Sequence, residues 1–377
     1  MKGRLMRVAY MPGDGVGHEV SVESQQVLAQ VAERDGFKYQ LIPFDLGATR
    51  YLGTGEVLPD AILEKLRGCD AILLGAVGDP RVPPGVLEKG ILLRLRFEFH
   101  QYINLRPVRL FPGVEGPIKG KGPDDVDMIV VRENNEDLYV GAGGFTRKGT
   151  PEEVAIQTSI NTRAGVERAI RYAFELARKR SQTGSFRGLS EADRKQGFVR
   201  QVTLVAKTNV LTFAHDLWMR AYQEVAQEYP QVKADYQHVD ACCMRMVVAP
   251  ERFDVIVTTN MFGDIITDLG AVLQGGLGLA ASGNINPERT APSMFEPVHG
   301  SAPDIAGKGI ANPLASILSL AMMLDHLEKP RSADRVRRAV ASVLAAGTPR
   351  TPDLGGKSTT KEVGQAVRDA LALDKSR

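Results

Sequence analysis

The chain has 377 residues, of which 43% are hydrophobic and 24% are charged. These fractions are ordinary for a globular protein and exclude an intrinsically disordered chain. The formal net charge of +2 gives no electrostatic reason to expect nucleic acid as a partner. A chain of this length is typical of two domains.

The cysteines and the apolar stretches indicate the compartment. The three cysteines, Cys69, Cys242 and Cys243, form neither a disulfide framework nor a zinc-binding spacing, so we interpret them as small buried thiols. Residues 1–12 lack the apolar core of a signal peptide. The apolar stretch at 314–324 is too short to span a bilayer. We therefore expect a cytoplasmic protein with no membrane partner.

The N-terminal hundred residues alternate between short β-type runs and helical patterns. We predict strands at residues 7–11, 39–44 and 71–74, the last of them fully buried because it is a continuous apolar run. A helix is predicted at 19–34, after a glycine-rich turn, and another at 85–101.

The same alternation continues to the C-terminus and is typical of an α/β fold. Two segments, 108–127 and 181–197, are rich in glycine, proline or polar residues, and we expect both to be surface excursions. The remaining predicted elements are strands at 104–111, 128–132, 154–160, 202–206 and 254–257, and helices at 163–180, 211–227, 313–327 and 333–345.

The first candidate site is the glycine-rich turn at residues 13–17, between the first strand and the first helix. Glycines there permit a tight turn and the close approach of a ligand to a helix N-terminus. The full GxGxxG spacing of a Rossmann dinucleotide site is missing. We favour a ligand-facing turn of another kind, and a purely structural turn stays an alternative.

The second candidate is the segment 260–268, which follows a predicted buried strand. Asp264 and Asp268 are four residues apart, so on a helix they share one face. Two carboxylates on one face repel each other unless a cation lies between them. Ligands in open α/β sheets bind where strands end, and Mg²⁺ or Mn²⁺ prefers oxygen ligands. The alternative is a solvated acidic face, which the apolar neighbours disfavour.

A third candidate is a set of arginines, Arg94, Arg96, Arg106 and Arg132, at or near predicted strand ends. Arginine at such positions is suited to bidentate binding of carboxylates. Any one of them alone is better explained by a surface salt bridge.

The fourth candidate is the irregular segment 296–312, which is full of turn-forming residues and contains His299 and Asp304. A long loop without regular structure in a compact domain is usually functional. An aspartate in such a loop can accept both hydroxyls of a ribose. His299 alone would be interpreted as structural.

Together these segments resemble the isocitrate/isopropylmalate dehydrogenase family, the metal-dependent β-decarboxylating dehydrogenases. The resemblance covers nearly the whole chain, from the turn at Gly13 to about Leu327, and is strongest to members that act on 3-isopropylmalate. The motifs that carry it are at residues 85–96, 104–107, 207–213, 237–241, 260–268 and 296–312.

The resemblance implies an isopropylmalate dehydrogenase-like fold, which is not a Rossmann fold. Two α/β domains share one continuous mixed sheet, and the chain crosses out of the first domain and back. By this resemblance residues 1–101 and 278–377 form the cofactor-binding domain. Residues 102–277 bind substrate and metal and form a homodimer with shared active sites.

The resemblance also implies roles for individual residues. Tyr139 and Lys207 match the catalytic pair, and the lysine and the first metal ligand come from the partner subunit in this family. The metal ligands are Asp240, Asp264 and Asp268. The substrate-binding residues are Leu92, Leu93, Arg96, Arg106, Arg132 and Asp240. The cofactor-binding residues are Glu296, His299, Gly300, Ser301, Ala302, Pro303, Asp304, Ile305 and Asn312.

The implied reaction is NAD- and Mg²⁺- or Mn²⁺-dependent oxidative decarboxylation of a malate-type acid, as in leucine biosynthesis. Asp304 followed by Ile305 is the NAD pattern of the family. The apolar Leu92 and Leu93 favour 3-isopropylmalate, while D-malate, tartrate or a related acid is the alternative. A catalytically silent regulatory relative is a third hypothesis, which the complete set of catalytic positions disfavours. One departure from the family is that residues 132–139 lack the glycine-rich tail expected before the tyrosine.

Overall fold

The computed structural model describes residues 4–374, and the chain divides into two compact units. Unit 1 consists of Met1–Gln101, Arg109–Pro123 and Ala271–Arg377, and unit 2 of Tyr102–Val108 and Asp124–Gly270. The domain boundaries implied by the family resemblance stay a prediction, because this division follows contacts within the chain and not function.

The sheet of unit 1 is mixed. It contains the strands β1 (Met6–Gly13), β2 (Tyr39–Pro43), β3 (Ala71–Ala76), β11 (Ala281–Ile285) and β12 (Ser293–Pro297). Their order is β2-β1-β3-β12-β11. The first four are parallel, and β11 runs antiparallel to β12. Every residue of β3 is buried, as expected for a continuous apolar run in a parallel sheet.

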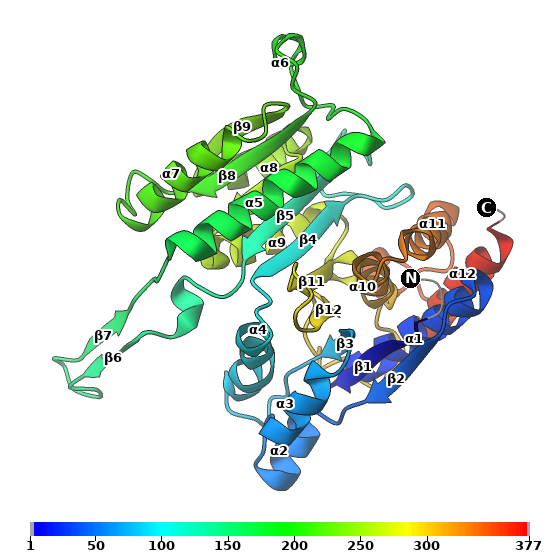
Figure 1. Ribbon diagram of the computed structural model, residues 1–377. Coiled ribbons are helices and arrows are strands. Elements are labelled where there is room, and N and C mark those ends of the chain that lie inside the picture. The colour runs from blue at the N-terminus through cyan, green and yellow to red at the C-terminus, as the bar shows by residue number, and fades with distance from the viewer. Residues whose placement is uncertain (1–3, 375–377) are drawn as a thin grey trace. The chain divides into compact units, whose positions relative to one another are not determined.

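Helices from distant parts of the chain cover this sheet. They are α1 (Gly17–Asp35), α2 (Ala48–Thr54), α3 (Asp60–Arg67), α4 (Arg94–Glu98), α10 (Leu314–His326), α11 (Pro330–Ala346) and α12 (Thr360–Leu373), with a π-helix at Glu88–Leu93 and 3₁₀ turns at Leu277–Leu279 and Pro352–Leu354. The first and last helices, α1 and α12, pack side by side (Figure 1). Arg368 on α12 forms an ion pair with Glu23 on α1 at 2.6 Å.

The helical segment before β4 is anchored by apolar residues at a spacing of four. Leu87, Ile91, Leu95 and Phe99 are almost fully buried and belong to the same core cluster as Ile72 of β3. This spacing keeps them on one side of the helix. The opposite side, with its arginines, is therefore turned away from the core.

The sheet of unit 2 has the order β4-β5-β10-β8-β9, and β5, β10, β8 and β9 are parallel. Two further strands form a separate antiparallel hairpin, β6-β7. The bounds of all seven are β4 (Ile103–Arg109), β5 (Asp127–Glu133), β6 (Gly143–Thr146), β7 (Val154–Gln157), β8 (Arg200–Ala206), β9 (Val232–His238) and β10 (Val255–Thr258).

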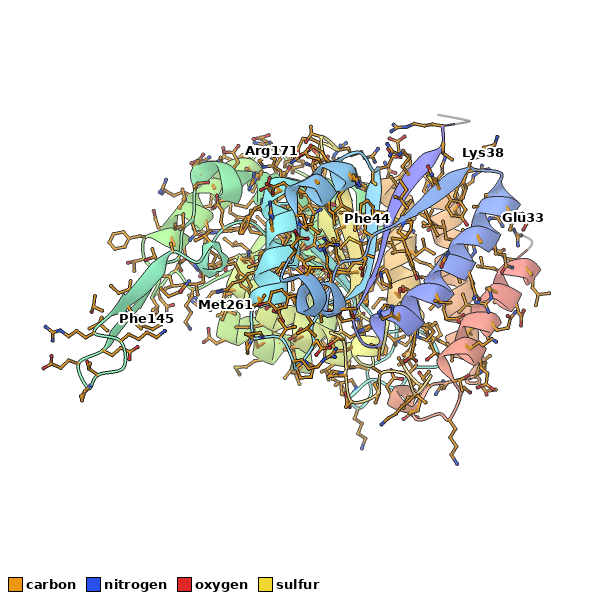
Figure 2. All side chains as sticks on the ribbon, turned by 90° about the horizontal axis from the view of Figure 1, so that it is seen from below. Glu33, Lys38, Phe44, Phe145, Arg171 and Met261 are labelled. Atoms are coloured by element: carbon orange, nitrogen blue, oxygen red, sulfur yellow. The ribbon has the colours of Figure 1, made fainter. Side chains whose placement is uncertain are left out.

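The helices of unit 2 are α5 (Arg163–Arg180), α6 (Glu191–Lys195), α7 (Ala214–Ala226), α8 (Val239–Val248) and α9 (Asn260–Leu273), with 3₁₀ turns at Leu138–Val140, Ser181–Thr183 and Pro250–Arg252. Thr162 caps α5 by accepting a hydrogen bond from the Gly165 N–H. The β6-β7 hairpin extends from unit 2 as an arm (Figure 1). Phe145 lies on this arm, clear of the other elements of unit 2 (Figure 2), and is 56% exposed.

The predicted elements differ from the structure in a few places. The helix predicted at 85–101 is a π-helix, Glu88–Leu93, followed by the short α4. The excursion at 181–197 contains the helix α6, which begins with a capping box between Ser190 and Asp193. Among the residues that the structure describes, no helix has both the length and the apolarity needed to cross a membrane.

Candidate active site

In unit 1 the glycine turn at 13–17 and the loop at 296–312 lie against each other. The backbone N–H of Val16 donates to the Ser301 carbonyl at 2.8 Å. Gly15 has φ +52°, and a Cβ there would lie 2.0 Å from the same carbonyl oxygen. Glycine is therefore required at this contact. The two segments predicted separately as ligand-facing thus form one structure.

A buried aspartate shapes the glycine turn. The Asp14 carboxylate is 5% exposed and accepts the backbone N–H of Ala48 at 2.8 Å and of Gly78 at 3.0 Å. Burial raises the pKa of Asp14, while these two hydrogen bonds oppose the rise. Asp14 therefore holds three loops together, a role that the sequence analysis did not assign to it.

The loop at 296–312 presents one side chain with an unused polar atom. His299 Nδ1 lies 3.0 Å from the Gly300 carbonyl, whereas its Nε2 is buried without a hydrogen-bond partner among the described residues. Burial lowers the pKa of His299, so the neutral ring leaves Nε2 as an acceptor. Asp304 is exposed on the same loop. The His299 Nε2 atom and the Asp304 carboxylate are both hydrogen-bond acceptors, so they fit a ligand that carries hydroxyl or amino groups.

Of the other predicted residues of this loop, some form hydrogen bonds within the protein and others are exposed to solvent. Glu296 accepts a hydrogen bond from Asn284 at 2.7 Å and lies 3.5 Å from Arg96 Nη2. Asn312 caps the N-terminus of α10 by accepting the Leu314 N–H at 3.0 Å. Gly300, Pro303 and Asp304 are exposed, Ala302 and Ile305 are half-buried, and Ser301 is buried.

The helical segment of unit 1 places apolar and cationic side chains next to each other. Leu92 and Leu93 are half-buried, in the π-helix that precedes α4. Arg96, one turn further on, is 7% exposed. Arg94 instead forms an ion pair with Asp60, whose side chain is 89% exposed, which is the surface salt bridge that the sequence analysis gave as the alternative. The segment therefore separates the arginine expected to bind substrate from the one that is not.

In unit 2 the two carboxylates of α9 lie beside a buried arginine. Arg106 Nη2 is 3.5 Å from Asp264 Oδ1, and its Nη1 is 3.9 Å from Asp268 Oδ1. The Arg106 Nη1 atom also donates to Thr267 Oγ1 at 2.6 Å. The side chains of Asp264 and Asp268 are 40% and 70% exposed, whereas that of Arg106 is 10% exposed. The carboxylates are thus accessible to a ligand, and the cation is fixed behind them.

Asp264 is also bound by two further side chains from the end of β5 and the turn after it. Arg132, 1% exposed, forms an ion pair with Asp264 and donates from Nε and Nη2 to Asn260 Oδ1 at 2.9 and 2.7 Å. The Tyr139 hydroxyl donates to Asp264 Oδ2 at 2.5 Å. Burial and this hydrogen bond raise the pKa of Tyr139, so its phenol stays protonated and can act as a proton donor.

The close packing of α9 on β5 depends on a glycine. A Cβ on Gly263 would lie 2.4 Å from Cγ of Arg132. No side chain fits there without displacing the buried arginine. Gly263 therefore allows α9 to bring Asp264 within ion-pair distance of Arg132.

The other predicted catalytic groups of unit 2 are a lysine and an aspartate, which form an ion pair. Lys207 Nζ, at the end of β8, donates to Asp240 Oδ1 on α8 at 2.6 Å. This hydrogen bond lowers the pKa of Asp240. The backbone N–H of Lys207 donates to His215 Nδ1 at 2.7 Å. Burial lowers the pKa of His215 to about 4, so the ring is a neutral acceptor that fixes the turn after β8.

Comparison with known proteins identifies the family. Residues 7–367 match the family described as isocitrate/isopropylmalate dehydrogenase. The chain belongs to this family. It is 54% identical over 372 residues to 3-isopropylmalate dehydrogenase of Thermobifida fusca, which covers 99% of both chains. It is 52% identical over 366 residues to 3-isopropylmalate dehydrogenase of Mycolicibacterium paratuberculosis, covering 97% of this chain and all of that one.

A solved structure agrees with the fold. Isocitrate dehydrogenase from Methylococcus capsulatus superposes with a TM-score of 0.84 at 37% identity, covering 97% of this chain and 99% of that one. The predicted fold class is thereby confirmed, and so are the predicted enzyme class and the oxidoreductase activity of a decarboxylating dehydrogenase.

The family consists of metal-dependent dehydrogenases. In this chain α9 offers two of the three expected metal ligands. Asp264 and Asp268 supply carboxylate oxygens one helical turn apart, the ligand type that Mg²⁺ and Mn²⁺ prefer. Within residues 4–374 no three His, Cys, Asp or Glu side chains gather into a ligand set. Asp240 therefore does not complete the set within one chain. The supply of Asp240 by a partner subunit stays a prediction.

Several site residues escaped the sequence analysis. Asn260 was included in a motif without a role, yet it binds Arg132. His215 and Asp14 position Lys207 and the glycine turn, respectively. The one available signal was at Asp14, because a charged residue between two glycines after a buried strand is unusual. Asn260 and His215 gave no signal, because their partners are distant in sequence.

Proposed function

We propose that this protein catalyses the NAD-dependent oxidative decarboxylation of 3-isopropylmalate to 4-methyl-2-oxopentanoate, a step of leucine biosynthesis. The observation that carries the proposal is the convergence of two buried arginines and a protonated tyrosine on Asp264, with Asp268 beside it. The full-length relatives named 3-isopropylmalate dehydrogenase support it.

The arginines would hold the two carboxylates of the substrate. Arg106 and Arg132 are buried, and hydrogen bonds to Thr267 and Asn260 orient their planar guanidinium groups, so these groups are pre-organised for carboxylate binding. Arg96 would add a third cation. Leu92 and Leu93, one turn before it, would contact the isopropyl group, whose transfer from water is favourable. D-malate and tartrate lack that group, so contact with these leucines would add no binding free energy for them.

Two protons must move in the reaction. Asp264, Asp268 and the partner's Asp240 would hold a divalent cation, which would supply Lewis acidity at the substrate's 2-hydroxyl, and NAD would supply the acceptor for the hydride of C2. Lys207, or a water that it orients with Asp240, takes the hydroxyl proton. After carbon dioxide leaves C3, the phenol of Tyr139 donates a proton to that carbon.

The nucleotide would bind along the loop at 296–312. The exposed Asp304 carboxylate would accept the ribose hydroxyls and repel a 2′-phosphate. His299 Nε2 would accept a hydrogen bond from the nucleotide. Replacing Asp304 by lysine together with Ile305 by tyrosine should lower kcat/KM for NAD by about tenfold and improve the use of NADP. Unchanged NAD kinetics would contradict the ribose-binding role.

A homodimer is part of this proposal. Lys207 and Asp240 lie near exposed apolar side chains of the loop at 210–213 and of α8, and further ones lie on the arm and on α9. A second copy that covers these side chains would remove them from water and would bring its own lysine to Asp264. The exposed apolar residues include Phe145, Ile156, Phe213, Met244, Val248 and Ile265.

The decisive assay measures NADH formation with 3-isopropylmalate, D-malate, tartrate and isocitrate, each with and without EDTA. We expect strong turnover with 3-isopropylmalate only, abolished by EDTA and restored by Mg²⁺ or Mn²⁺. Preferential turnover of D-malate or tartrate would show that the substrate is that acid and not 3-isopropylmalate. Turnover that survives EDTA would contradict the metal assignment. A Met244→Asp variant should elute as a monomer in size-exclusion chromatography and lose activity.

A further inference from the structure

One residue beside the catalytic tyrosine has an unusual backbone conformation. Asp137, two residues before Tyr139, has φ +66° and ψ −145°. This combination lies in a region that non-glycine residues rarely adopt, and such strain persists only where surrounding contacts enforce it. It coincides with the place where the family resemblance leads us to expect glycine. The chain therefore carries an aspartate where the backbone alone would favour glycine.

The Asp137 side chain provides the enforcing contacts. It is 6% exposed. Its Oδ2 accepts the backbone N–H of Met261 at 2.9 Å, and its Oδ1 accepts the Ser159 hydroxyl at 2.6 Å. Its backbone N–H donates to the Ile160 carbonyl at 2.7 Å in an isolated antiparallel bridge. Both carboxylate oxygens and the backbone are thus engaged, and a glycine here would keep the backbone contact but lose both side-chain contacts.

The contact with Met261 connects two catalytic elements. Met261 is in the first turn of α9, where backbone N–H groups have no partner within the helix. α9 has no acidic residue of its own in that turn. A carboxylate at a helix N-terminus both accepts a free N–H and interacts favourably with the helix dipole. Asp137 therefore caps the helix that carries Asp264, and it does so from the turn that carries Tyr139.

A second hydrogen bond strengthens the same junction. Asn260 Nδ2, at the start of α9, donates to the Glu136 carbonyl at 3.2 Å. The neighbouring Glu136 side chain is instead directed at α5, where it accepts the Thr162 N–H at 2.8 Å. Adjacent residues of one turn thus anchor different helices: the Glu136 side chain anchors α5, and the Asp137 side chain anchors the N-terminus of α9.

We propose that Asp137 is a positioning residue, which fixes the Tyr139 hydroxyl relative to Asp264 by tying the tyrosine's turn to the N-terminus of α9. The proposal rests on the proposed function, because it assigns Tyr139 the proton transfer to C3. The 2.5 Å contact between Tyr139 and Asp264 is the geometry that Asp137 maintains. In this role Asp137 acts through Met261, Ser159 and Ile160 and not by contact with substrate or cofactor.

The test compares three variants of the full-length protein with the wild type. Asp137→Gly relieves the backbone strain and removes the cap. Asp137→Asn keeps an acceptor for the Met261 N–H and an amide that can donate to Ser159, and asparagine tolerates positive φ. Ser159→Ala removes the Oδ1 partner, together with the hydrogen bond that Ser159 accepts from Asn161 Nδ2 at 2.8 Å, but leaves the Met261 contact intact, and is the matched control. The measurements are kcat and KM for 3-isopropylmalate, the Mn²⁺ dissociation constant by electron paramagnetic resonance, and the thermal midpoint.

We expect Asp137→Gly to lower kcat about 30-fold, because proton transfer is sensitive to small displacements, with KM and the Mn²⁺ dissociation constant changed less than about threefold. Its thermal midpoint should shift by less than about 3 °C, because relief of strain offsets the lost hydrogen bonds. Asp137→Asn should recover most of kcat, and Ser159→Ala should stay within about twofold of the wild type.

Three outcomes would overturn the proposal. A kcat of Asp137→Gly within twofold of the wild type would show that the cap does not matter. A loss of kcat that parallels a loss of thermal stability would show a merely structural role. Failure of Asp137→Asn to recover activity would exclude the hydrogen bond as the cause. Failure of the proposed function is a different result, since the wild-type protein would then not oxidise 3-isopropylmalate at all.

Discussion

Two regions of unit 2 carry catalytic groups, and they are built differently. Around Asp264 three side chains, Arg106, Arg132 and Tyr139, reach one carboxylate, and the two arginines are only 10% and 1% exposed; we call this the closed region. The Lys207–Asp240 pair rests on one ion pair of 2.6 Å between side chains that are 25% and 65% exposed, and we call it the open region.

The two regions divide the groups of the proposed site between them. The closed region holds the cations that a dicarboxylate requires and two of the expected metal ligands. The open region holds the expected base and the third ligand, next to exposed apolar residues such as Phe213, which is 93% exposed. Under the proposed function, one chain carries two half-sites, and a second copy would join one half to the other.

The largest effect is expected in the open half-site. Lys207→Ala removes the proposed base and leaves the α9 cluster intact, so kcat should fall by about 10³-fold or more, with little change in KM. Lys233→Ala is the matched control, because Lys233 forms a similar pair with Asp193 at 2.9 Å away from the catalytic groups. A Lys207→Ala protein with the full rate would remove the lysine from the mechanism.

A smaller but still large effect is expected in the closed half-site. Asp264→Asn removes a metal ligand and leaves Arg132, which is 1% exposed, without its ion-pair partner. We expect kcat/KM to fall by about 10²-fold and the Mn²⁺ concentration for half-maximal activity to rise. Asp216→Asn, which removes only the exposed pair with Arg220, should have no effect. An unchanged metal dependence of the Asp264→Asn variant would show that Asp264 is not a metal ligand.

The smallest effect concerns stability of the closed region. Glu133, next to Arg132, is 1% exposed, and burial raises its pKa from 4.5 to about 7. The Glu133 carboxyl group therefore loses its proton at a lower pH in the unfolded chain than in the folded protein. The contribution of Glu133 to stability is therefore complete below pH 4.5 and is lost as the pH rises to 7.

Denaturant unfolding of the wild type and Glu133→Gln at several pH values checks this prediction. The stability of the wild type relative to the variant should fall by about 3 kcal/mol between pH 4.5 and pH 7.5. A difference that is constant with pH would show that Glu133 is ionised throughout, held by its hydrogen bonds from the Asn135 and Glu136 N–H groups.

Much of the fold followed from local patterns in the sequence. Continuous apolar runs marked the buried strands β3 and β10, and the spacing of four between Asp264 and Asp268 placed them on one side of a helix. These features depend on periodicity, which a sequence displays directly. The family resemblance supplied the roles of Tyr139, Lys207 and the loop at 296–312, which periodicity alone did not give.

The remaining features depend on contacts between distant residues. The pairing of Arg132 with Asp264 joins positions 132 residues apart, and no local pattern indicates it. The strained conformation of Asp137 is enforced by Met261, which lies 124 residues further along the chain. The π-helix at Glu88–Leu93 resembles an α-helix in its apolar spacing. Tertiary packing decides such features, so the sequence could not specify them.

Complementation between inactive variants tests the division of the site most directly. Lys207→Ala and Asp264→Asn chains would be unfolded together and refolded as a mixture, and oxidation of 3-isopropylmalate would be measured. If the site is shared, half of the dimers contain one intact site, and activity should return to about a quarter of the wild-type rate. A mixture no more active than its separate components would contradict a site built from two chains.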